Sequence, residues 1–459
     1  MGPLNASIFR EYDIRGIVAE DLTDQAVEMI ASAYATVFAR ENKKRLALGM
    51  DGRPSSEHIK NLVKEVLCRY GLEVIDIGLV PTPLMYYAVF KMNLDGGLMI
   101  TASHNPPEYN GVKALVGKES QAGEQIKEIY DLAIKGDFPP IKPGRSEKRD
   151  IIPDYLDYIC RDITLKKPVK VVIDAGNGTA GITAGLLYKR LGAQVEEIYC
   201  DVDGRFPNHH PDPTKPENLL DLIARVKETG ADLGIGFDGD GDRLGVVDGQ
   251  GHILWGDILT LIFARDILAK IPGAKIISEV KASDILYSEI EKLGGRAIMW
   301  KAGHSLIKKK IVEENAALAG EVSGHIFFND RWFGFDDAVY AGARLLEILS
   351  GTGQSLNQVL ATIPQVANTP EIRVDATDEA KFKIVDLVAE YFKKSFPVID
   401  IDGARIKFPH GWALVRASNT QPSLVIRYEA DSPEHLQDIQ AQVEPILERF
   451  TQEVSRQVI

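Results

Sequence analysis

The sequence contains little cysteine: Cys68, Cys160 and Cys200 are the three cysteines among its 459 residues. Their number is odd, and their separations match no metal-binding spacing. Few cysteines, odd in number and without metal-binding spacing, are typical of proteins in a reducing compartment. The cysteine content therefore predicts a cytoplasmic protein.

The sequence also lacks the features that direct a chain to membranes or nucleic acids. No apolar run approaches the ~20 residues that a membrane-spanning helix requires. The first residues contain no basic segment followed by an apolar one, and Ala6 breaks the myristoylation pattern. The net charge of −13 opposes binding to polyanions. We therefore expect neither a nucleic acid nor a membrane as a partner.

The most informative feature that is present is an acidic loop. Asp238, Asp240 and Asp242 alternate with two glycines, and Arg243 follows directly. Side chains two residues apart on a locally extended backbone face the same way, so the three carboxylates are expected to converge. Carboxylates that repel one another in this way are stabilised by a divalent cation, and all-oxygen ligands select Mg²⁺ or Ca²⁺.

A calcium loop of the EF-hand type is the obvious alternative for this segment. Counted from Asp238, the sixth position of such a loop requires Gly and the twelfth requires Glu, but this chain has Arg243 and Gly249 there. The flanking segments 232–237 and 244–248 indicate strands rather than helices. The EF-hand interpretation fails, and a solvated acidic turn remains the other reading. Arg243 beside the cluster favours a second anion, such as a phosphate, near Mg²⁺.

A second loop supplies a candidate nucleophile, Ser103. It follows a short apolar strand over 97–100 and precedes Pro106 and Pro107, which stiffen the loop. The surroundings do not match the Gly-x-Ser-x-Gly elbow of hydrolases, and an ordinary turn serine is the alternative. His104 is predicted to be a poor base for Ser103, because neighbouring side chains on an extended segment diverge.

Two further loops are rich in polar side chains. In the turn after residues 316–320, Glu321, Ser323 and His325 alternate and are expected to share a face that suits sugar hydroxyls. Near the C-terminus, the segment Ala417-Ser-Asn-Thr-Gln-Pro422 lies between Arg416 and Arg427. Hydroxyls, amides and two arginines in this arrangement predict a cradle for a phosphate dianion, with a plain hairpin turn as the alternative.

Taken together, these motifs resemble the α-D-phosphohexomutase superfamily, most closely its bacterial or archaeal phosphomannomutase/phosphoglucomutase branch. The resemblance covers essentially the whole chain, in order. It rests on Tyr12-Asp-Ile-Arg15-Gly16, Thr101-Ala-Ser-His-Asn-Pro106, Asp238-Gly-Asp-Gly-Asp-Arg243, Gly320-Glu-Val-Ser-Gly-His325 and Arg416-Ala-Ser-Asn-Thr420.

The resemblance implies a phosphotransfer reaction between hexose 1-phosphate and hexose 6-phosphate. Ser103 would carry a phosphate and donate it to the sugar, giving a hexose 1,6-bisphosphate that turns over and returns its other phosphate. Mg²⁺ would be held by Asp238, Asp240, Asp242 and an oxygen of phosphorylated Ser103. Catalysis of phosphoryl transfer depends mainly on positioning the reacting groups and on neutralising the negative charge on the oxygens of the transferred phosphoryl group.

The resemblance also implies roles for the remaining polar residues. The cations expected at the transfer end are Arg15, Lys113 and Arg243. His325 is the first choice of general base, and His104 is expected to support the serine loop. The residues expected to bind substrate are Tyr12, Lys281, His304, Glu321, Ser323, Arg416, Ser418, Asn419, Thr420 and Arg427.

The strand and helix pattern predicts four domains. A strand followed by a small-residue turn and a helical stretch recurs at 46–51, 171–176 and 275–280, which argues for three similar α/β domains. The last segment breaks this rhythm, with amphipathic helices expected near 378–392 and 433–454, and indicates a smaller α+β domain. The predicted boundaries are 1–150, 151–254, 255–367 and 368–459, arranged around a central cleft, and the last domain is expected to move.

Several alternatives stay open at this point. A phosphoglucosamine mutase is the second choice, although it would more typically show Ser-Gly-Thr in the phosphate loop. Val322 replaces the methionine common in the dual-specificity branch, so the preference among mannose, glucose and glucosamine is undecided. A catalytically silent sugar-phosphate sensor, or a phosphatase that transfers to water, is a reading from another class. The oligomeric state, monomer or dimer, is also undecided.

Overall fold

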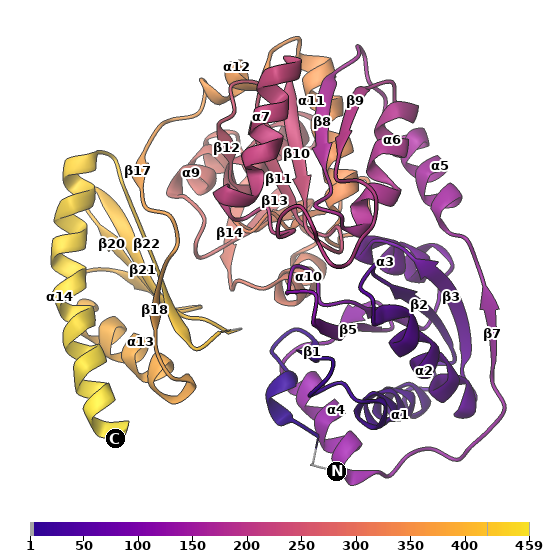
Figure 1. The fold of residues 1–459 in the computed structure, drawn as a ribbon. Helices are drawn as coiled ribbons and strands as arrows, with labels where there is room; N and C mark the ends of the chain where they lie inside the picture. The colour runs from indigo at the N-terminus through magenta and orange to yellow at the C-terminus, as the bar shows by residue number, and fades with distance from the viewer. Residues whose placement is uncertain (1–3, 420, 459) are drawn as a thin grey trace.

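The structure is a computed structural model. It describes residues 4–419 and 421–458, with side chains described as far as residue 454. Within these residues the strands form four separate sheets, one in each predicted domain. Figure 1 shows the first domain at the lower right, the second and third above it, and the fourth on the left.

The first domain is a mixed α/β unit. Its sheet has the order β1-β5-β4-β2-β3-β7, with β6 paired to β5. The strands β2, β3 and β4 are parallel, and β4 is antiparallel to β5. The elements are a 3₁₀ turn (Ala6–Ile8), β1 (Ile14–Ile17), α1 (Asp24–Arg40), β2 (Arg45–Met50), α2 (Ser56–Arg69), β3 (Glu73–Leu79), α3 (Thr82–Lys91), β4 (Gly96–Ile100), β5 (Tyr109–Val116), β6 (Glu119–Ser120), α4 (Glu124–Lys135) and β7 (Arg145–Lys148).

The second domain repeats this plan with the strand order β12-β11-β10-β8-β9. Its strands β8, β9 and β10 are parallel, and β10 is antiparallel to β11. The elements are α5 (Ile152–Asp162), β8 (Lys170–Asp174), a 3₁₀ turn (Thr179–Ile182), α6 (Ala184–Arg190), β9 (Gln194–Ile198), a 3₁₀ turn (Pro216–Leu219), α7 (Leu220–Thr229), β10 (Leu233–Phe237), β11 (Leu244–Asp248) and β12 (Ile253–Leu254).

The third domain has the strand order β14-β13-β15-β16, again with one antiparallel pair, β15 and β16. In all three domains, the strand that precedes a polar loop turns back into an antiparallel neighbour, which confirms the predicted α/β architecture. The elements are α8 (Gly256–Lys270), β13 (Lys275–Glu279), α9 (Asp284–Lys292), β14 (Arg296–Trp300), α10 (His304–Glu314), β15 (Leu318–Gly320), β16 (Ile326–Phe328), α11 (Ala338–Thr352) and α12 (Leu356–Leu360).

The fourth domain is an antiparallel sheet covered by two helices, as expected for α+β. Its order is β17-β22-β21-β20-β19, with β18 also paired to β22. The two helices predicted from the sequence pattern are α13 and α14. The elements are β17 (Ala367–Asn368), β18 (Ile372–Asp375), α13 (Asp378–Phe392), β19 (Val398–Ile399), β20 (Ala404–Phe408), β21 (Gly411–Ala417), β22 (Ser423–Ala430) and α14 (Pro433–Val458).

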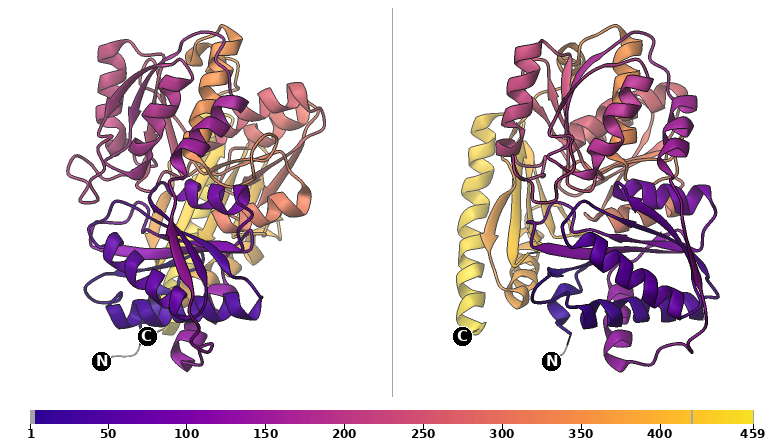
Figure 2. Two further views of the ribbon diagram at one scale, coloured as in Figure 1. Left: turned by 90° about the vertical axis from the view of Figure 1, so that its right-hand side faces the viewer. Right: turned by 45° about the vertical axis from the view of Figure 1, so that its right-hand side comes forward.

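One hydrophobic core extends through the first three domains, the first domain also has a second core of its own, and the fourth domain has a separate core. The shared core includes Tyr87 from the first domain, Leu187 from the second and Trp332 from the third. The core of the fourth domain lies between its sheet and α13 and α14. The right-hand view in Figure 2 shows this domain to the side of the other three. The buried guanidinium of Arg405 anchors it to the third domain by donating to the carbonyl oxygens of Val280 and Ala282.

Candidate active site

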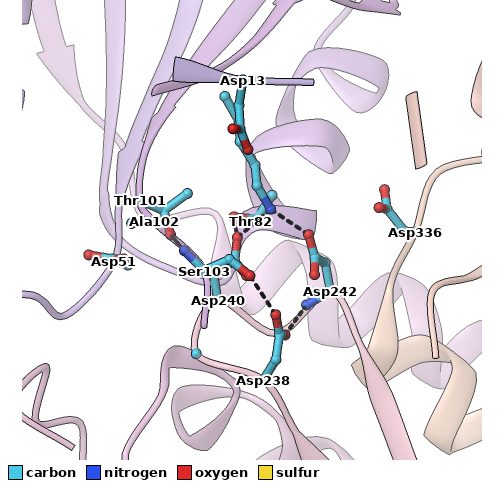
Figure 3. Close-up of polar contacts among 12 residues, drawn as sticks. Asp13, Asp51, Thr82, Thr101, Ala102, Ser103, Asp238, Asp240, Asp242 and Asp336 are labelled. Atoms are coloured by element: carbon cyan, nitrogen blue, oxygen red, sulfur yellow. Dashed lines mark hydrogen bonds and ion pairs between the residues drawn. The ribbon is translucent and has the colours of Figure 1, made fainter. Parts of the chain in front are cut away.

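The acidic loop joins β10 to β11 at the edge of the second domain. Its three aspartates are fully buried, and their candidate ligand oxygens lie within 4.8 Å of one another. The predicted convergence is therefore present (Figure 3). The extended backbone assumed from the sequence is wrong, because Gly241 has φ +76° and its N–H donates to the carbonyl oxygen of Asp238. A tight turn brings the carboxylates together.

The hydroxyl of Ser103 lies directly against this acidic loop. Ser103 follows β4 of the first domain and is 1% exposed. Its Oγ donates a hydrogen bond to Oδ2 of Asp238 over 2.7 Å, across the boundary between two domains (Figure 3). The candidate nucleophile and the candidate metal ligands thus occupy one buried site.

The expectation that His104 diverges from Ser103 is wrong. Ser103 has φ +51°, a left-handed conformation instead of an extended one, and this places Nδ1 of His104 3.1 Å from Oγ of Ser103. The serine proton is directed to Asp238, so the imidazole is left to donate to Oγ. Burial, together with the cations Arg243 and Arg15, lowers the pKa of His104 well below its ordinary value.

Three of the predicted cations surround the acidic loop. Nζ of Lys113 is 2.7 Å from Asp240 and 2.6 Å from Asp242. Arg15 donates to the Ala102 carbonyl over 3.2 Å, and Nε of Arg243 donates to Nε2 of His325 over 2.9 Å. A buried site with this many cations suits an anionic ligand.

Lys113 changes the ionisation of the acidic loop. Burial and the Asp242 carboxylate act to raise the pKa of Asp240, but the Lys113 ammonium and the hydrogen bond from Thr82 outweigh them and lower it. Asp238, which Lys113 does not contact directly, has its pKa raised well above the ordinary value by burial and by the charges of Asp242 and Asp240. At Asp238, the charges of Arg243 and Lys113 therefore do not offset burial and the repulsion of the other two carboxylates.

The acidic loop fits a metal ion. Among the described residues, Oδ1 of Asp240 and Oδ1 of Asp242 are buried oxygens without a hydrogen-bond partner. A buried carboxylate oxygen left without a partner is costly. Because every candidate ligand here is an oxygen, the donor set favours a hard divalent cation.

The polar loop of the third domain is a turn between β15 and β16. The shared face predicted for Glu321, Ser323 and His325 assumed an extended segment, and this is wrong because Gly324 has φ +90° and its N–H donates to the carbonyl of Glu321. Glu321 and His325 nevertheless both face the start of α10. Glu321 accepts a hydrogen bond from the Gly303 N–H over 2.7 Å, and the His325 and His304 rings stack with their centroids 5.3 Å apart.

Two ionisable groups of this turn have displaced pKa values. Burial, with the nearby Glu279 carboxylate, raises the pKa of Glu321 to about 7. Burial, with Arg243 and Lys113 nearby, lowers the pKa of His325 well below its ordinary value. At neutral pH the His325 imidazole is therefore uncharged.

Asp336 completes the surroundings of His325 and was not anticipated from the sequence. Its Oδ1 accepts from Lys308 over 2.9 Å, and its Oδ2 lies 3.2 Å from Nδ1 of His325. Figure 3 places it beyond Asp242, away from Ser103. The pair Asp336-Asp337 stands directly before α11, and Asp337 caps that helix. Because an aspartate before a helix is ordinarily a helix cap, the sequence alone offers no reason to assign Asp336 to the active site.

Arg53 is a second residue that was missed. Its guanidinium is buried and donates to the carbonyl oxygens of Ser103, over 2.8 Å, and of Tyr109, over 3.1 Å. Arg53 follows the carboxyl end of β2, the parallel neighbour of β4. Because Arg53 follows a strand that was predicted from the sequence, its place at the carboxyl end of that strand could have indicated a site residue.

The loop of the fourth domain reaches the first and third domains. Nδ2 of Asn419 donates to the Tyr12 hydroxyl over 3.0 Å, and that hydroxyl donates to the Ala302 carbonyl over 2.8 Å. Arg416 donates to Asp402 over 2.8 Å, and Arg427 donates to the Lys281 carbonyl over 2.7 Å.

The other predicted residues near this loop are Ser418, Thr420 and Lys281. Ser418 is buried in the same loop, and Thr420 lies outside the described residues. The Lys281 ammonium is 3.4 Å from Glu279 and 3.3 Å from Glu371. Hydrogen bonds between side chains thus connect all four domains.

Each of the four domains matches a domain of one enzyme group. The first three match alpha/beta/alpha domains I, II and III of phosphoglucomutase/phosphomannomutase over residues 6–140, 153–251 and 255–366. Residues 371–446 match the C-terminal domain of the same enzymes. The chain belongs to the phosphoglucomutase/phosphomannomutase family.

Members of this family match nearly the whole chain. Phosphomannomutase/phosphoglucomutase of Pseudomonas aeruginosa is 47% identical over 439 residues, covering 95% of this chain and 94% of the relative. Phosphoglucomutase of Neisseria meningitidis serogroup A is 46% identical over 452 residues, covering 98% of each. The crystal structure of a phosphoglucomutase/phosphomannomutase family protein from Burkholderia thailandensis has a TM-score of 0.93 at 40% identity, covering 97% of this chain and 98% of that chain.

These matches confirm the predicted superfamily and the predicted enzyme class, an isomerase that moves phosphate between the 1- and 6-positions of a hexose. The buried acidic triad fits a metal-dependent phosphohexomutase, and small sugar phosphates are the ligands of such an enzyme. None of the helices in the described part of the chain is both long and apolar enough to cross a membrane.

Proposed function

We propose that this protein interconverts the 1- and 6-phosphates of mannose and glucose through a phosphoserine at Ser103 and a hexose 1,6-bisphosphate. The observation that carries the proposal is the 2.7 Å hydrogen bond between Oγ of Ser103 and Asp238 within the buried acidic triad. In the transfer step the bond from phosphorus to Oγ breaks, and a bond from phosphorus to a sugar oxygen forms. The sugar hydroxyl loses its proton to a base.

Positive charge at the transfer end stabilises the moving phosphoryl group. The ion proposed here is Mg²⁺, held by Asp238, Asp240, Asp242 and a phosphoserine oxygen, and when bound it neutralises charge on the phosphoryl oxygens. Lys113, which is paired with two of these carboxylates, would bind the same oxygens together with Arg15 and Arg243. Pre-positioned cations suit a reaction whose transition state spreads negative charge.

His325 is the proposed general base, and Asp336 is proposed to position it. Because Nε2 of His325 accepts from Arg243, its Nδ1 carries the proton and donates to Asp336. The Nε2 lone pair becomes available when Arg243 turns to the phosphoryl group. The Asp336 carboxylate then holds the ring in place and stabilises the imidazolium that forms.

The remaining residues are proposed to hold the part of the substrate that does not react. Glu321 and Ser323 would bind sugar hydroxyls, with Tyr12, Lys281 and His304 beside them. A second cluster would clamp the phosphate distant from the metal: Arg416, Ser418, Asn419, Thr420 and Arg427. Binding one phosphate at each end allows the bisphosphate to return in either orientation, as the reaction requires.

Sugar preference is tested by assaying the purified protein, in Mg²⁺ with catalytic glucose 1,6-bisphosphate, on three substrates. We expect turnover of glucose 1-phosphate and mannose 1-phosphate within about tenfold of each other, because a site that binds common hydroxyls discriminates weakly against one inverted centre. We expect far weaker turnover of glucosamine 1-phosphate. A dominant amino-sugar activity would overturn the proposed substrate class, and no mutase activity at all would overturn the function.

The fourth domain is expected to change its orientation when sugar phosphate binds. The Asn419–Tyr12 hydrogen bond joins it to the first domain, and its own closed core lets it move as a unit. Small-angle scattering with and without glucose 1,6-bisphosphate should show a smaller radius of gyration in the complex, with unphosphorylated glucose as the control. Indistinguishable scattering in all three samples would contradict the prediction.

A further inference from the structure

The fourth domain carries a second group of metal-ligating side chains that the mutase reaction does not use. His410 lies in the turn between β20 and β21, Asp431 directly follows β22, and His435 lies in the first turn of α14. Their candidate ligand atoms lie within 4.8 Å of one another. We propose that these three residues form a binding site for Zn²⁺.

The two imidazoles converge on one carboxylate. Nδ1 of His410 is 3.0 Å from Oδ2 of Asp431, and Nδ1 of His435 is 2.5 Å from Oδ1. The two rings are stacked with their centroids 3.9 Å apart and their planes 11° apart. Both ring nitrogens therefore already face the same carboxylate, and a metal ion would replace the two hydrogen bonds once the rings turn toward it.

The main chain fixes the positions of all three residues. The Asp431 N–H donates to the His410 carbonyl oxygen over 3.0 Å, next to the pairing of Gly411 with Ala430 in the sheet. The His435 N–H donates to Oγ of Ser432 over 3.1 Å at the start of α14. A site whose ligands are held by their own backbone loses little conformational entropy when it binds an ion.

The ligand set selects a transition metal, unlike the acidic triad of the active site. Two imidazoles and one carboxylate, with a position left for water, are a common coordination of Zn²⁺, whereas Mg²⁺ prefers oxygen ligands. The side chains of His410, Asp431 and His435 are 54%, 57% and 38% exposed, so an ion can enter from solvent. The pairs His58–Asp24 and His252–Asp248 each have a single imidazole and make no comparable site.

The proposed Zn²⁺ site lies far from the loop 417–422, which we call the phosphate loop because we propose that it binds the substrate phosphate. His410 precedes β21, whereas the phosphate loop follows it at Ala417. A strand of this length spans roughly 20 Å. Zn²⁺ would tie the β20–β21 turn to α14 and stabilise the fourth domain without contacting the substrate, so the proposal is independent of the mutase mechanism.

The test uses the full-length protein in excess Mg²⁺, which occupies all-oxygen sites, with Zn²⁺ and Co²⁺ as probes. We expect calorimetric binding of one Zn²⁺ per chain and a rise in the unfolding temperature, because the ion binds the folded state preferentially. Co²⁺ should give the visible absorption of a four- or five-coordinate ion. His410→Ala and His435→Ala should each weaken Zn²⁺ binding at least about tenfold, while His58→Ala should leave it unchanged.

The mutase activity in Mg²⁺ separates loss of the site from loss of the fold. His410→Ala and His435→Ala should keep wild-type kcat/KM, since neither residue is near the substrate. The double variant, which combines His410→Ala and His435→Ala, gives the decisive result. If it binds Zn²⁺ as tightly as the wild-type protein does, the ion binds elsewhere and the proposal is overturned. Absence of the Co²⁺ absorption in the wild-type protein would overturn it too.

Discussion

Ser103→Ala is expected to lower kcat by roughly a thousandfold or more, because it removes the hydroxyl oxygen that we propose carries the phosphoryl group. Oγ of Ser103 lies 2.7 Å from Asp238. The nearest alternative hydroxyls are engaged differently: Thr101 Oγ1 accepts from the Ser103 N–H, and Thr82 Oγ1 donates to Asp240. Intact mass spectrometry should find one phosphate on the wild-type protein and none on the variant.

A matched control distinguishes chemistry from folding. Alanine retains the Cβ of serine, so the backbone at φ +51° is affected in the same way, and the lost hydrogen bond to Asp238 costs about 1–3 kcal/mol of stability. Thr101→Ser keeps the neighbouring hydroxyl and should retain most activity and the phosphate. Near-normal turnover by Ser103→Ala, measured on glucose 1-phosphate, would refute the phosphoserine assignment.

Asp240→Asn is expected to reduce kcat about a hundredfold and to raise the Mg²⁺ concentration needed for half-maximal activity. The substitution keeps the shape of the side chain but removes one charge from the triad. Oδ1 of Asp240 is a buried oxygen without a hydrogen-bond partner among the described residues, which is the oxygen we expect to face the ion. Activity measured as a function of Mg²⁺ checks both effects.

The control for this experiment leaves the charge in place. Thr82 Oγ1 donates to Oδ2 of Asp240 over 2.6 Å, so Thr82→Val removes a neighbour of the carboxylate and not the carboxylate itself. We expect Thr82→Val to change the Mg²⁺ requirement much less than Asp240→Asn does. An Mg²⁺ dependence that is unaltered in Asp240→Asn would exclude this residue as a ligand.

Local patterns in the sequence predicted the elements and most of the loops. The strands around the acidic loop are β10 and β11, and α13 spans Asp378–Phe392, as the periodicity indicated. Periodicity works here because each element has one face packed on a core. The four domains follow from the same patterns.

The conformations within the loops could not be predicted in this way. The left-handed backbone of Ser103 brings His104 back toward Oγ, and Gly241 and Gly324 turn the chain where an extended segment was assumed. Such conformations are imposed by contacts with other domains. One example is the Leu244 N–H of the second domain, which donates to the Gly324 carbonyl of the third.

Local sequence patterns also could not predict contacts between residues that are far apart in the sequence. Asp336 is one of two adjacent acidic residues before a helix, where a capping role is the ordinary expectation. Its contact with His325 exists only because the turn after β16 returns to the same site. The pairing of Lys113 with Asp240 and Asp242 likewise depends on two domains meeting.

The shared interior of the first three domains bears on how members of this family can be recombined. Tyr87, Tyr155 and Trp332 come from three domains and contact one another through their rings. Exchanging any one of these domains with that of a relative would require the new side chains to pack against the aromatic rings of the two domains that remain. The fourth domain, which encloses its own apolar side chains, is the natural unit for grafting, provided that the graft keeps Arg405 and Trp412 at the joint.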